Sequence, residues 1–319
     1  MTDSDRIEVS IVVVSYNTRE MTLECLRSVF RETRDTAFEL IVLDNASADG
    51  SAAAIAAEFG DRLRLIESKD NLGFALGNNR AAESARGEFL LLLNPDTVVL
   101  DRAIDRLMAF AKRRPEHGIW GGRTVFADGS LNPGSCWSRQ TPWSLVCQAL
   151  GLSSLFRRVG LFNPEGLGGW DRRGEREVDI VSGCFFLIRR ELWNRLGGFN
   201  TEFFMYGEEA DLCLRARQLG ARPAISGDAT IVHYGGASET VRSDKLVRLL
   251  KAKMDLIRLH FPATKRAAGY WLLSLWPRTR WYAHALLSAL GRRASVERRN
   301  VWREVVRRER EWSAALRAD

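Results

Sequence analysis

The motif Asn94-Pro95-Asp96 places a carboxylate directly after a run of five apolar residues, FLLLL. Pro95 fixes its own backbone φ and biases Asn94 towards an extended conformation, so Asp96 is presented at a preset position where a buried strand would end. A hard cation such as Mg²⁺ or Mn²⁺ that bridges a carboxylate and a diphosphate needs a rigid oxygen ligand of this kind. The motif alone is short, and its meaning depends on the groups that accompany it.

A second acidic cluster, Glu208, Glu209 and Asp211, begins a segment with a helical pattern. Acids in the first turn of a helix are stabilised by the helix dipole, so a purely structural role is one interpretation. Neighbouring carboxylates also raise one another's pKa, and a general base that works near neutral pH needs a raised pKa. The cluster therefore admits a structural and a catalytic interpretation.

Small polar residues follow other predicted strands. Asp44 lies at the start of DNASADGS, where it is either an Asx turn or helix cap, or part of a cluster that reads the imide edge of a uracil or thymine base. Asn71 and Gly73 follow the third strand, where they form a capped turn or let the backbone approach a ligand closely. His233 ends a late strand and is either structural or a contact for metal or diphosphate.

The elements that would position these groups alternate along the first hundred residues. Predicted strands cover residues 10–16, 38–44, 63–68 and 88–94, and predicted helices cover residues 19–31, 51–59 and 77–85. Continuously apolar strands separated by helices indicate a parallel sheet covered on both faces, in which ligands bind beyond the carboxyl ends of the strands. Neither a Gly-x-Gly-x-x-Gly turn nor a phosphate-binding Gly-Lys-Ser/Thr loop follows a strand, which disfavours a dehydrogenase and a P-loop enzyme.

Further elements follow this block. Residues 103–113 are a predicted helix, and GIWGGRTVFADGS indicates a hairpin. Residues 133–177 have no clear periodicity, although 145–159 could be helical; a connection of this length is typical of a lid or binding loop. FFMYGEEADLCLRARQLG predicts a strand, a turn and a helix, and DATIVHYGG predicts a strand.

Charge separates the last part of the chain from the rest. Residues 241–319 hold 19 Lys and Arg against 7 Asp and Glu, a net charge of +12, whereas the whole chain of 319 residues carries +7. The five cysteines have no metal-binding spacing and favour a reducing compartment. The N-terminus lacks a signal-peptide pattern, and the apolar stretch near residue 275 is broken by Pro277, Arg278 and Arg280. We therefore expect a cytoplasmic protein.

Seven motifs in order, SIVVVSYN, LIVLDNASADGS, DNLGFALGNN, LLLNPDT, VSGCFFLIRRELWNRLGGFN, FFMYGEEADLCLR and IVHYGG, resemble the family 2 glycosyltransferases with a GT-A fold. They are most similar to the bacterial rhamnosyltransferase-like branch of polysaccharide assembly. The resemblance covers residues 8–240. It implies an α/β fold with a Rossmann-like nucleotide-binding, mainly parallel sheet flanked by helices, followed by a C-terminal helical extension.

The resemblance also assigns roles to residues that match the family's motifs. Asn94-Pro95-Asp96 stands where the family has Asp-x-Asp, so Asp96, together with His233, would hold Mg²⁺ or Mn²⁺. Glu208 and Glu209 stand where the family has a Glu-Asp pair, so Glu209 would be the catalytic base, with Glu208 and Asp211 as substitutes. The residues expected to bind the nucleotide sugar are Ser15, Asn17, Asp44, Asn71, Gly73, Asn79 and Asn94.

The expected reaction is the inverting transfer of a sugar, with rhamnose from dTDP-rhamnose as first choice and UDP-sugars as the other donor class, to a saccharide or lipid-linked saccharide. Residues 1–240 would form the catalytic domain, with residues 133–177 as the acceptor-side loop region. Residues 241–319 would form a basic amphipathic extension that either packs on the catalytic domain or contacts an anionic membrane, which would make the protein peripheral on the inner face of the cell membrane.

Two other functions remain open from the sequence. A non-catalytic nucleotide-sugar-binding protein could keep the nucleoside pocket, but it would not need the acids at 208–211. A nucleic-acid-binding protein could use the basic tail, but the net charge of −5 on residues 1–240 would repel phosphate, so no nucleic acid is expected as a partner.

Overall fold

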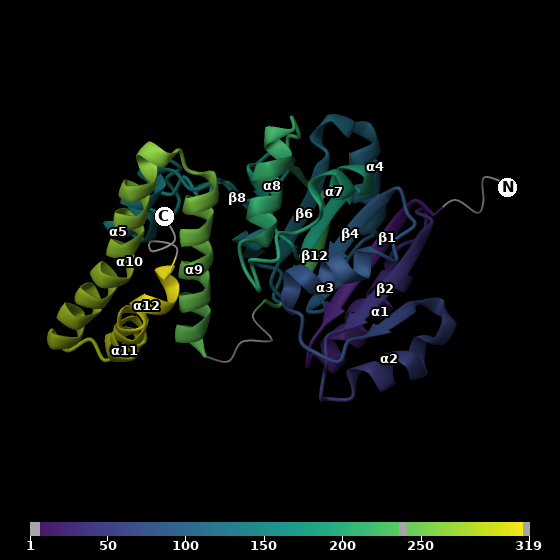
Figure 1. Cartoon of the computed structure of the whole chain (residues 1–319), viewed down its shortest axis with the longest axis horizontal. Helices are drawn as coiled ribbons and strands as arrows, with labels where there is room; N and C mark the ends of the chain where they lie inside the picture. Colours follow the sequence, from purple (N-terminus) through teal and green to yellow (C-terminus); the bar gives the residue numbers. More distant parts are fainter. Residues whose placement is uncertain (1–6, 236–240, 315–319) are drawn as a thin grey trace. The chain divides into compact units, whose positions relative to one another are not determined.

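The computed structural model describes residues 7–235 and 241–314 (Figure 1). The chain divides into two compact units. Unit 1 comprises Met1–Trp137 and Asp171–Ser238, and unit 2 comprises Ser138–Trp170 and Glu239–Asp319. In this division residues 138–170 group with the C-terminal helices, and the assignment of residues 1–240 to a catalytic domain and of residues 241–319 to an extension stays a prediction.

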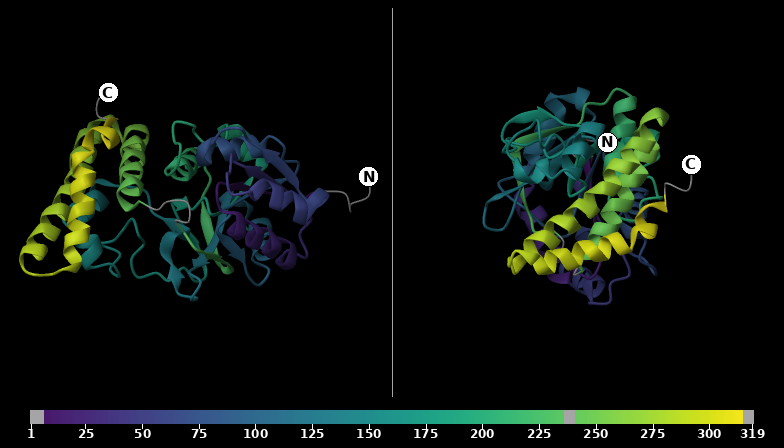
Figure 2. Two further views of the ribbon diagram at one scale, coloured as in Figure 1. Left: turned by 90° about the horizontal axis from the view of Figure 1, so that it is seen from below. Right: turned by 90° about the vertical axis from the view of Figure 1, so that its left-hand side faces the viewer.

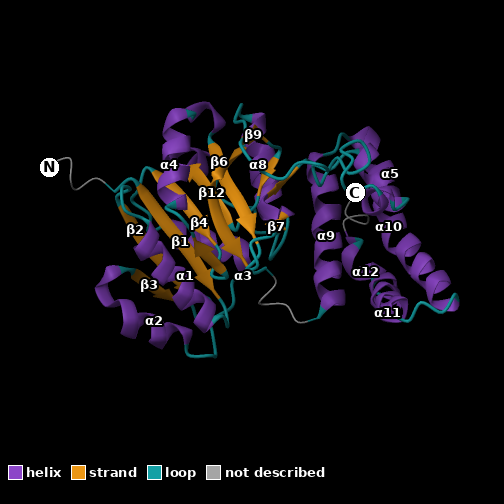
Figure 3. Cartoon of the chain, turned by 180° about the vertical axis from the view of Figure 1, so that it is seen from behind, coloured by secondary structure: helices purple, strands orange, loops and turns teal. Residues whose placement is uncertain are grey.

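Unit 1 is built on a ten-stranded sheet whose main order is β3-β2-β1-β4-β11-β6-β12-β5 (Figure 3). The strands are β1 (Val9–Ser15), β2 (Phe38–Asp44), β3 (Arg64–Glu67), β4 (Phe89–Leu93), β5 (Thr97–Val99), β6 (Ile119–Val125), β7 (Leu131–Asn132), β9 (Glu175–Glu177), β11 (Phe185–Arg189) and β12 (Ala224–His233). The first four strands in this order are parallel, β11 runs antiparallel between β4 and β6, and β12 is parallel to β6. Strands β8 (Cys136–Trp137) and β10 (Ile180–Val181) form a separate antiparallel pair.

Helices cover both faces of this sheet. They are α1 (Arg19–Glu32), α2 (Ser51–Phe59), α3 (Gly73–Ala82), α4 (Ala103–Arg113), α7 (Arg190–Leu196) and α8 (Glu208–Gln218). Every residue of β1 is buried; Val9, Ile11 and Val13 pack into a core with α1, α2 and α4. On the other face α3 approaches so closely that a Cβ at Gly77 would lie 3.1 Å from Val14 Cγ1. The predicted α/β fold with a mainly parallel, doubly covered sheet is confirmed.

Unit 2 is helical. Its helices are α5 (Pro142–Ala149), α6 (Leu152–Leu155), α9 (Arg242–His260), α10 (Ala263–Ala289), α11 (Ala294–Arg307) and α12 (Glu309–Trp312). Its core joins Leu145 of α5 to Leu250, Leu273 and Trp312 of the C-terminal helices. The Thr279 hydroxyl donates to the Ala149 carbonyl at 2.7 Å, and α10 lies against α11 (Figure 2). Residues 138–170 thus complete the hydrophobic core of this unit.

The predicted elements of the first hundred residues are confirmed, and the hairpin forms between β6 and β7. Three predictions need correction. Helix α3 begins at Gly73 rather than at residue 77. The segment FFMY is a turn, because Tyr206 and Gly207 take left-handed φ values of 70° and 93° before α8. The region 145–159 is broken into α5 and α6 at Gly151, whose φ is 81°. Within residues 7–235 and 241–314, we find no helix of the length and apolar character that a bilayer crossing requires.

Candidate functional site

The carboxyl ends of β1, β2 and β4 meet at one edge of the sheet, which we call the strand-end edge. Ser15 pairs with Asp44 in the parallel register of β1 and β2, and Val12 of β1 pairs with Leu92 of β4. Strand β11 enters this edge from the opposite direction, so the Asn94 N–H donates to the Cys184 carbonyl at 3.1 Å. Segments from three strand exits and one strand entry are therefore neighbours here.

Asp96 lies between β4 and the end of β12. It is 7% exposed, and its Oδ2 accepts a hydrogen bond from the Gly235 N–H at 3.1 Å, while Oδ1 lies 3.4 Å from His233 Nε2. Burial alone would lower the pKa of His233, but Cys184 and the Asp96 carboxylate outweigh it and raise that pKa to about 10. The structure thus brings Asp96 and His233 together, as the sequence predicted.

The groups around Asp96 determine whether a divalent cation could bind there. Asn94 Oδ1 and His233 Nδ1 are buried and have no hydrogen-bond partner among the described residues. Among the described residues, no group of three or more His, Cys, Asp or Glu could hold a metal ion. Mg²⁺ commonly takes one or two carboxylates and completes its shell with water and substrate phosphates. Asp96 fits a cation of that kind, and the described residues offer no complete protein cage.

Glu208 and Glu209 begin α8, directly after the left-handed Tyr206 and Gly207. A Cβ built at Gly183 would lie 3.9 Å from Glu209 Cβ, which brings Glu209 beside the segment that precedes β11. Burial raises the pKa of Glu209, and hydrogen bonds from backbone N–H groups, including that of Gly183, offset only part of this effect. Burial and the neighbouring Glu209 together raise the pKa of Glu208 well above its ordinary value.

The two glutamates differ in accessibility. Glu208 is 3% exposed, whereas Glu209 is partly exposed. In both residues Oε2 is buried and has no hydrogen-bond partner within the part of the chain that the structure describes. A base must reach a substrate hydroxyl, so the partly exposed Glu209 suits that role better than Glu208.

Asp211 makes an ion pair within α8, and its predicted catalytic role stays a prediction. It is 2% exposed and accepts a hydrogen bond from Arg215 Nε at 2.7 Å, one helical turn along α8. The same guanidinium donates to the carbonyls of Leu196 and Gly198 at 2.8 and 2.9 Å. Asp211 therefore orients an arginine that fixes α8 to the end of α7.

Of three residues expected to bind the nucleoside, Asp44 has a side-chain oxygen without a hydrogen-bond partner among the described residues, whereas Asn17 and Ser15 bond to protein groups. Asp44 is 4% exposed; its Oδ2 accepts from the Ser47 N–H at 3.0 Å, while Oδ1 is buried without a partner. Asn17, at a φ of 51°, accepts from the Ala48 N–H at 2.8 Å and so supports the loop after β2. Ser15 is fully buried and its hydroxyl lies 2.9 Å from that of Thr22, so it secures α1 rather than facing a ligand.

Asn45, which was not among the predicted site residues, organises the turn before α3. Its Nδ2 donates to Asn71 Oδ1 at 2.9 Å and to the Gly73 carbonyl at 3.2 Å, and its Oδ1 accepts from the Leu72 N–H at 2.8 Å. This amide joins the end of β2 to the turn that holds Asn71. Its position directly after Asp44 was the only sequence signal that could have indicated it.

Gly73 and Asn79 of α3 hold protein segments in place. A Cβ at Gly73 would lie 2.5 Å from the Phe204 carbonyl, which accepts from the Phe74 N–H at 2.9 Å. Asn79 exchanges two hydrogen bonds of 2.9 Å with the backbone of Phe199. Both residues therefore position the segment that leads into α8, and the Asn79 amide is occupied by protein rather than open to a ligand.

The sequence that forms this site matches a known protein family. The model of "Glycosyl transferase family 2" matches residues 10–197, which is more than half of the chain. The chain belongs to glycosyltransferase family 2. This match includes the strand-end edge at β1, β2 and β4, while Glu209 and His233 lie beyond its end.

Relatives of this family 2 member include proteins of bacterial polysaccharide assembly. The chain is 28% identical over 236 residues to the O-antigen biosynthesis protein RfbC of Myxococcus xanthus, covering 72% of the chain and 18% of the relative. It is 29% identical over 209 residues to the N-acetylglucosaminyl-diphospho-decaprenol L-rhamnosyltransferase of Mycobacterium tuberculosis, covering 61% of the chain and 66% of that protein. The match thus spans less than a fifth of the first relative and about two thirds of the second.

Solved structures show the same fold. The mannosyltransferase PcManGT of Pyrobaculum calidifontis, solved in complex with GDP-Man and Mn²⁺, gives a TM-score of 0.58 at 19% identity, covering 98% of this chain and 86% of the other. S. aureus TarS gives a TM-score of 0.52 at 18% identity, covering 86% of this chain and 43% of the other. At these identities the likeness extends to the fold alone.

Proposed function

We propose that this family 2 member is an inverting glycosyltransferase that uses a nucleotide-sugar donor. The observation that carries the proposal is Glu209, a partly exposed residue beside the strand-end edge whose carboxylate has a raised pKa. A raised pKa makes this carboxylate a stronger base than an ordinary glutamate at neutral pH.

In the proposed reaction Glu209 takes the proton from an acceptor hydroxyl. The hydroxyl oxygen attacks the anomeric carbon from the face opposite the diphosphate, and the bond from that carbon to the phosphate oxygen breaks as the new glycosidic bond forms. The nucleoside diphosphate leaves with the electron pair, and the configuration at the anomeric carbon is inverted. Gly183 and Gly207 supply backbone N–H groups that orient the Glu209 carboxylate.

The nucleoside would lie at the ends of β1 and β2. Asp44 Oδ1 is buried without a partner and could accept a hydrogen bond from the imide N–H of a uracil or thymine base. Asn17 and Asn71 would shape the walls of this part, because their amide oxygens already accept from the surrounding loops. We do not include Ser15 and Asn79 among the proposed ligand-binding residues, because their side chains bond to other protein groups.

Asp96 would hold the cation, with His233 and the orphaned Asn94 Oδ1 nearby in the fold. A bound Mg²⁺ or Mn²⁺ would supply charge that stabilises the leaving diphosphate. The chain's own contribution is to fix Asp96 through Gly235 and His233 so that its carboxylate needs no reorientation on binding.

Rhamnose from dTDP-rhamnose is the donor sugar that we propose, and a saccharide or lipid-linked saccharide is the acceptor. The names of two relatives, an O-antigen biosynthesis protein and an N-acetylglucosaminyl-diphospho-decaprenol L-rhamnosyltransferase, support this choice. The helical insertion of residues 138–170 is our candidate for acceptor selection. A cytoplasmic location stays a prediction.

A thermal-shift screen of nucleotide sugars with and without Mg²⁺ or Mn²⁺ tests the donor and the metal together. We expect the melting temperature to rise with a dTDP- or UDP-sugar, and to rise further when the cation is present, because a ligand that binds only the folded state stabilises it. No rise with any nucleotide sugar would contradict the proposal. A rise without any donor turnover in the presence of saccharide acceptors would instead indicate a non-catalytic binding protein.

A further inference from the structure

Helix α10 of unit 2 carries an apolar stripe that the described residues of its own unit leave largely exposed. The stripe, here called the α10 stripe, consists of Trp271, Leu275, Tyr282 and Leu286. Trp271, Tyr282 and Leu286 are each 63% exposed. Their spacings of 4, 7 and 4 residues bring all four to one face of a helix. Large apolar side chains aligned in this way are unusual on a surface that faces only water.

The opposite face of α10 already has a partner. Gly269, Tyr270, Leu273 and Pro277 are buried, and Tyr270 and Leu273 belong to the core of unit 2. The stripe is therefore not needed to fold this unit. It extends over about 22 Å at the rise of an α-helix, which suits a surface contact parallel to the helix axis.

The sequence around the stripe is basic, and Lys265, Arg292 and Arg293 are exposed there. From Leu256 to Val296 the sequence has no Asp or Glu and seven Lys or Arg residues. The seven are Arg258, Lys265, Arg266, Arg278, Arg280, Arg292 and Arg293. An apolar stripe within an acid-free basic segment is complementary to a surface that presents anionic groups above apolar chains.

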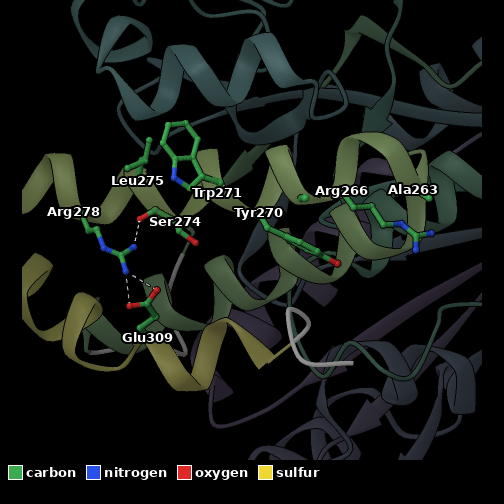
Figure 4. A pocket seen from close by; sticks show the side chains of 9 residues that line it. Ala263, Arg266, Tyr270, Trp271, Ser274, Leu275, Arg278 and Glu309 are labelled. Carbon is green, nitrogen blue, oxygen red and sulfur yellow. Dashed lines mark hydrogen bonds and ion pairs between the residues drawn. The ribbon is translucent and has the colours of Figure 1, made fainter. Parts of the chain in front are cut away.

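A groove of about 850 Å³ adjoins the stripe (Figure 4). It is lined by small residues of α10 together with Tyr270, Trp271, Leu275, Arg278 and Glu309. Trp271 and Leu275 belong to both the groove and the stripe, and Arg278 reaches away from them to a two-pronged ion pair with Glu309 at 2.7 and 2.6 Å. The ion pair fixes α10 against α12, so the stripe is held on a rigid element.

We propose that the α10 stripe binds the surface of an anionic phospholipid bilayer. Trp271 and Tyr282 would lie among the headgroups, and Leu275 and Leu286 would reach the first part of the acyl chains. The exposed Lys265, Arg292 and Arg293 would face lipid phosphates. This contact would keep the protein beside lipid-linked acceptors. It does not depend on transfer activity and can be tested separately from it.

Vesicle flotation with the full chain tests the stripe. We expect wild type to float with vesicles of phosphatidylcholine and phosphatidylglycerol, and to float less with phosphatidylcholine alone or at high salt, because salt screens the arginines. The double variant Trp271→Gln/Leu286→Gln should bind at least about tenfold more weakly, since it removes two of the inserted apolar groups. Its melting temperature should stay close to that of wild type, because both side chains are exposed.

A matched control is Phe126→Gln/Leu219→Gln, which removes two apolar side chains that are 40% and 43% exposed on unit 1. This control should float as wild type does. Equal flotation of the stripe variant and wild type would overturn the proposal, because binding would then come from the basic charge alone. A wild-type dimer in light scattering that the stripe variant converts to a monomer, with no change in flotation, would also overturn it and assign the stripe to a second copy of this chain.

Discussion

The strand-end edge of unit 1 and the α10 stripe of unit 2 leave opposite kinds of group without a partner. At the edge, Asp44, Asn94 and Glu209 each keep a buried polar oxygen that has no hydrogen-bond partner among the described residues. On the stripe, Trp271 and Leu286 are largely exposed within the part of the chain that the structure describes. Buried polar atoms without partners are rare in folded proteins, and so are aligned exposed apolar side chains. The first kind predicts a polar ligand, and the second predicts an apolar surface.

The two regions also differ in how they are held. At the edge, hydrogen bonds join separate segments, such as those of Asn45 across the turn before α3. The stripe is held by a single helix whose other face is buried. Changes at the edge should therefore alter chemistry without altering flotation, and changes on the stripe should do the reverse.

The substitution Asp96→Ala should give the largest difference between an effect on sugar transfer and an effect on flotation. Because Asp96 is the proposed carboxylate ligand, we expect sugar transfer to fall by about 10³-fold or more, with flotation unchanged. Donor turnover and vesicle flotation of the same preparation measure both. If Asp96→Ala transferred sugar near the wild-type rate, Asp96 would not be the cation ligand that we propose.

A smaller effect, on stability rather than chemistry, is expected from Asp211→Ala. It leaves the Arg215 guanidinium without its acid in a half-buried position, so the free energy of unfolding should fall by about 2–4 kcal/mol. Urea unfolding measures this loss, and Asp211→Asn, which keeps a hydrogen-bond acceptor, should lose less. If Asp211→Ala stayed fully stable but lost transfer, Asp211 would belong to the chemistry of the edge after all.

The smallest effect is a gain in stability from Glu208→Gln. The pKa of Glu208 is raised in the folded state, so the folded protein holds this proton more tightly than the unfolded chain does. The stability from this group is complete below the ordinary pKa of 4.5 and is lost as pH rises through the raised pKa. Glutamine avoids that loss, so the variant should melt about 2–4 °C above wild type near neutral pH.

Melting curves of both proteins between pH 4 and pH 8 check the direction of this pH dependence, because the series begins near the ordinary pKa of a glutamate. The difference between Glu208→Gln and wild type should shrink as pH falls. A variant that is less stable than wild type at every pH would show that the Glu208 carboxylate is satisfied in the folded protein.

The sequence predicted the sheet and its strand ends well, because continuous apolar runs, Pro95 and the polar residues after each strand are local signals. It also predicted that Asp96 and His233 would meet. It could not tell which polar side chains face outward. Asn79 is occupied by the backbone of Phe199, a residue 120 positions away, and no local pattern carries that information.

The same limit applies to the acids of α8 and to the insertion. Glu209 and Asp211 are two residues apart, but the partner of Asp211 lies on its own helix while Glu209 lies beside Gly183 of another segment. Residues 138–170 join unit 2 through Leu145 and Ala149, whose contacts lie more than 100 residues further along the chain. Long-range packing decided the surroundings of Glu209 and the place of residues 138–170, and periodicity does not report such packing.

The most direct test of the proposed transfer reaction compares Glu209→Gln with Glu208→Gln in one assay of donor turnover. We expect Glu209→Gln to lose transfer by about 10²- to 10⁴-fold, as removal of a general base does, while it still gains melting temperature from the nucleotide sugar and cation. Glu208→Gln should keep most of its activity. Full turnover by Glu209→Gln together with an inactive Glu208→Gln would contradict the assignment of the base and, with it, the proposed geometry of the strand-end edge.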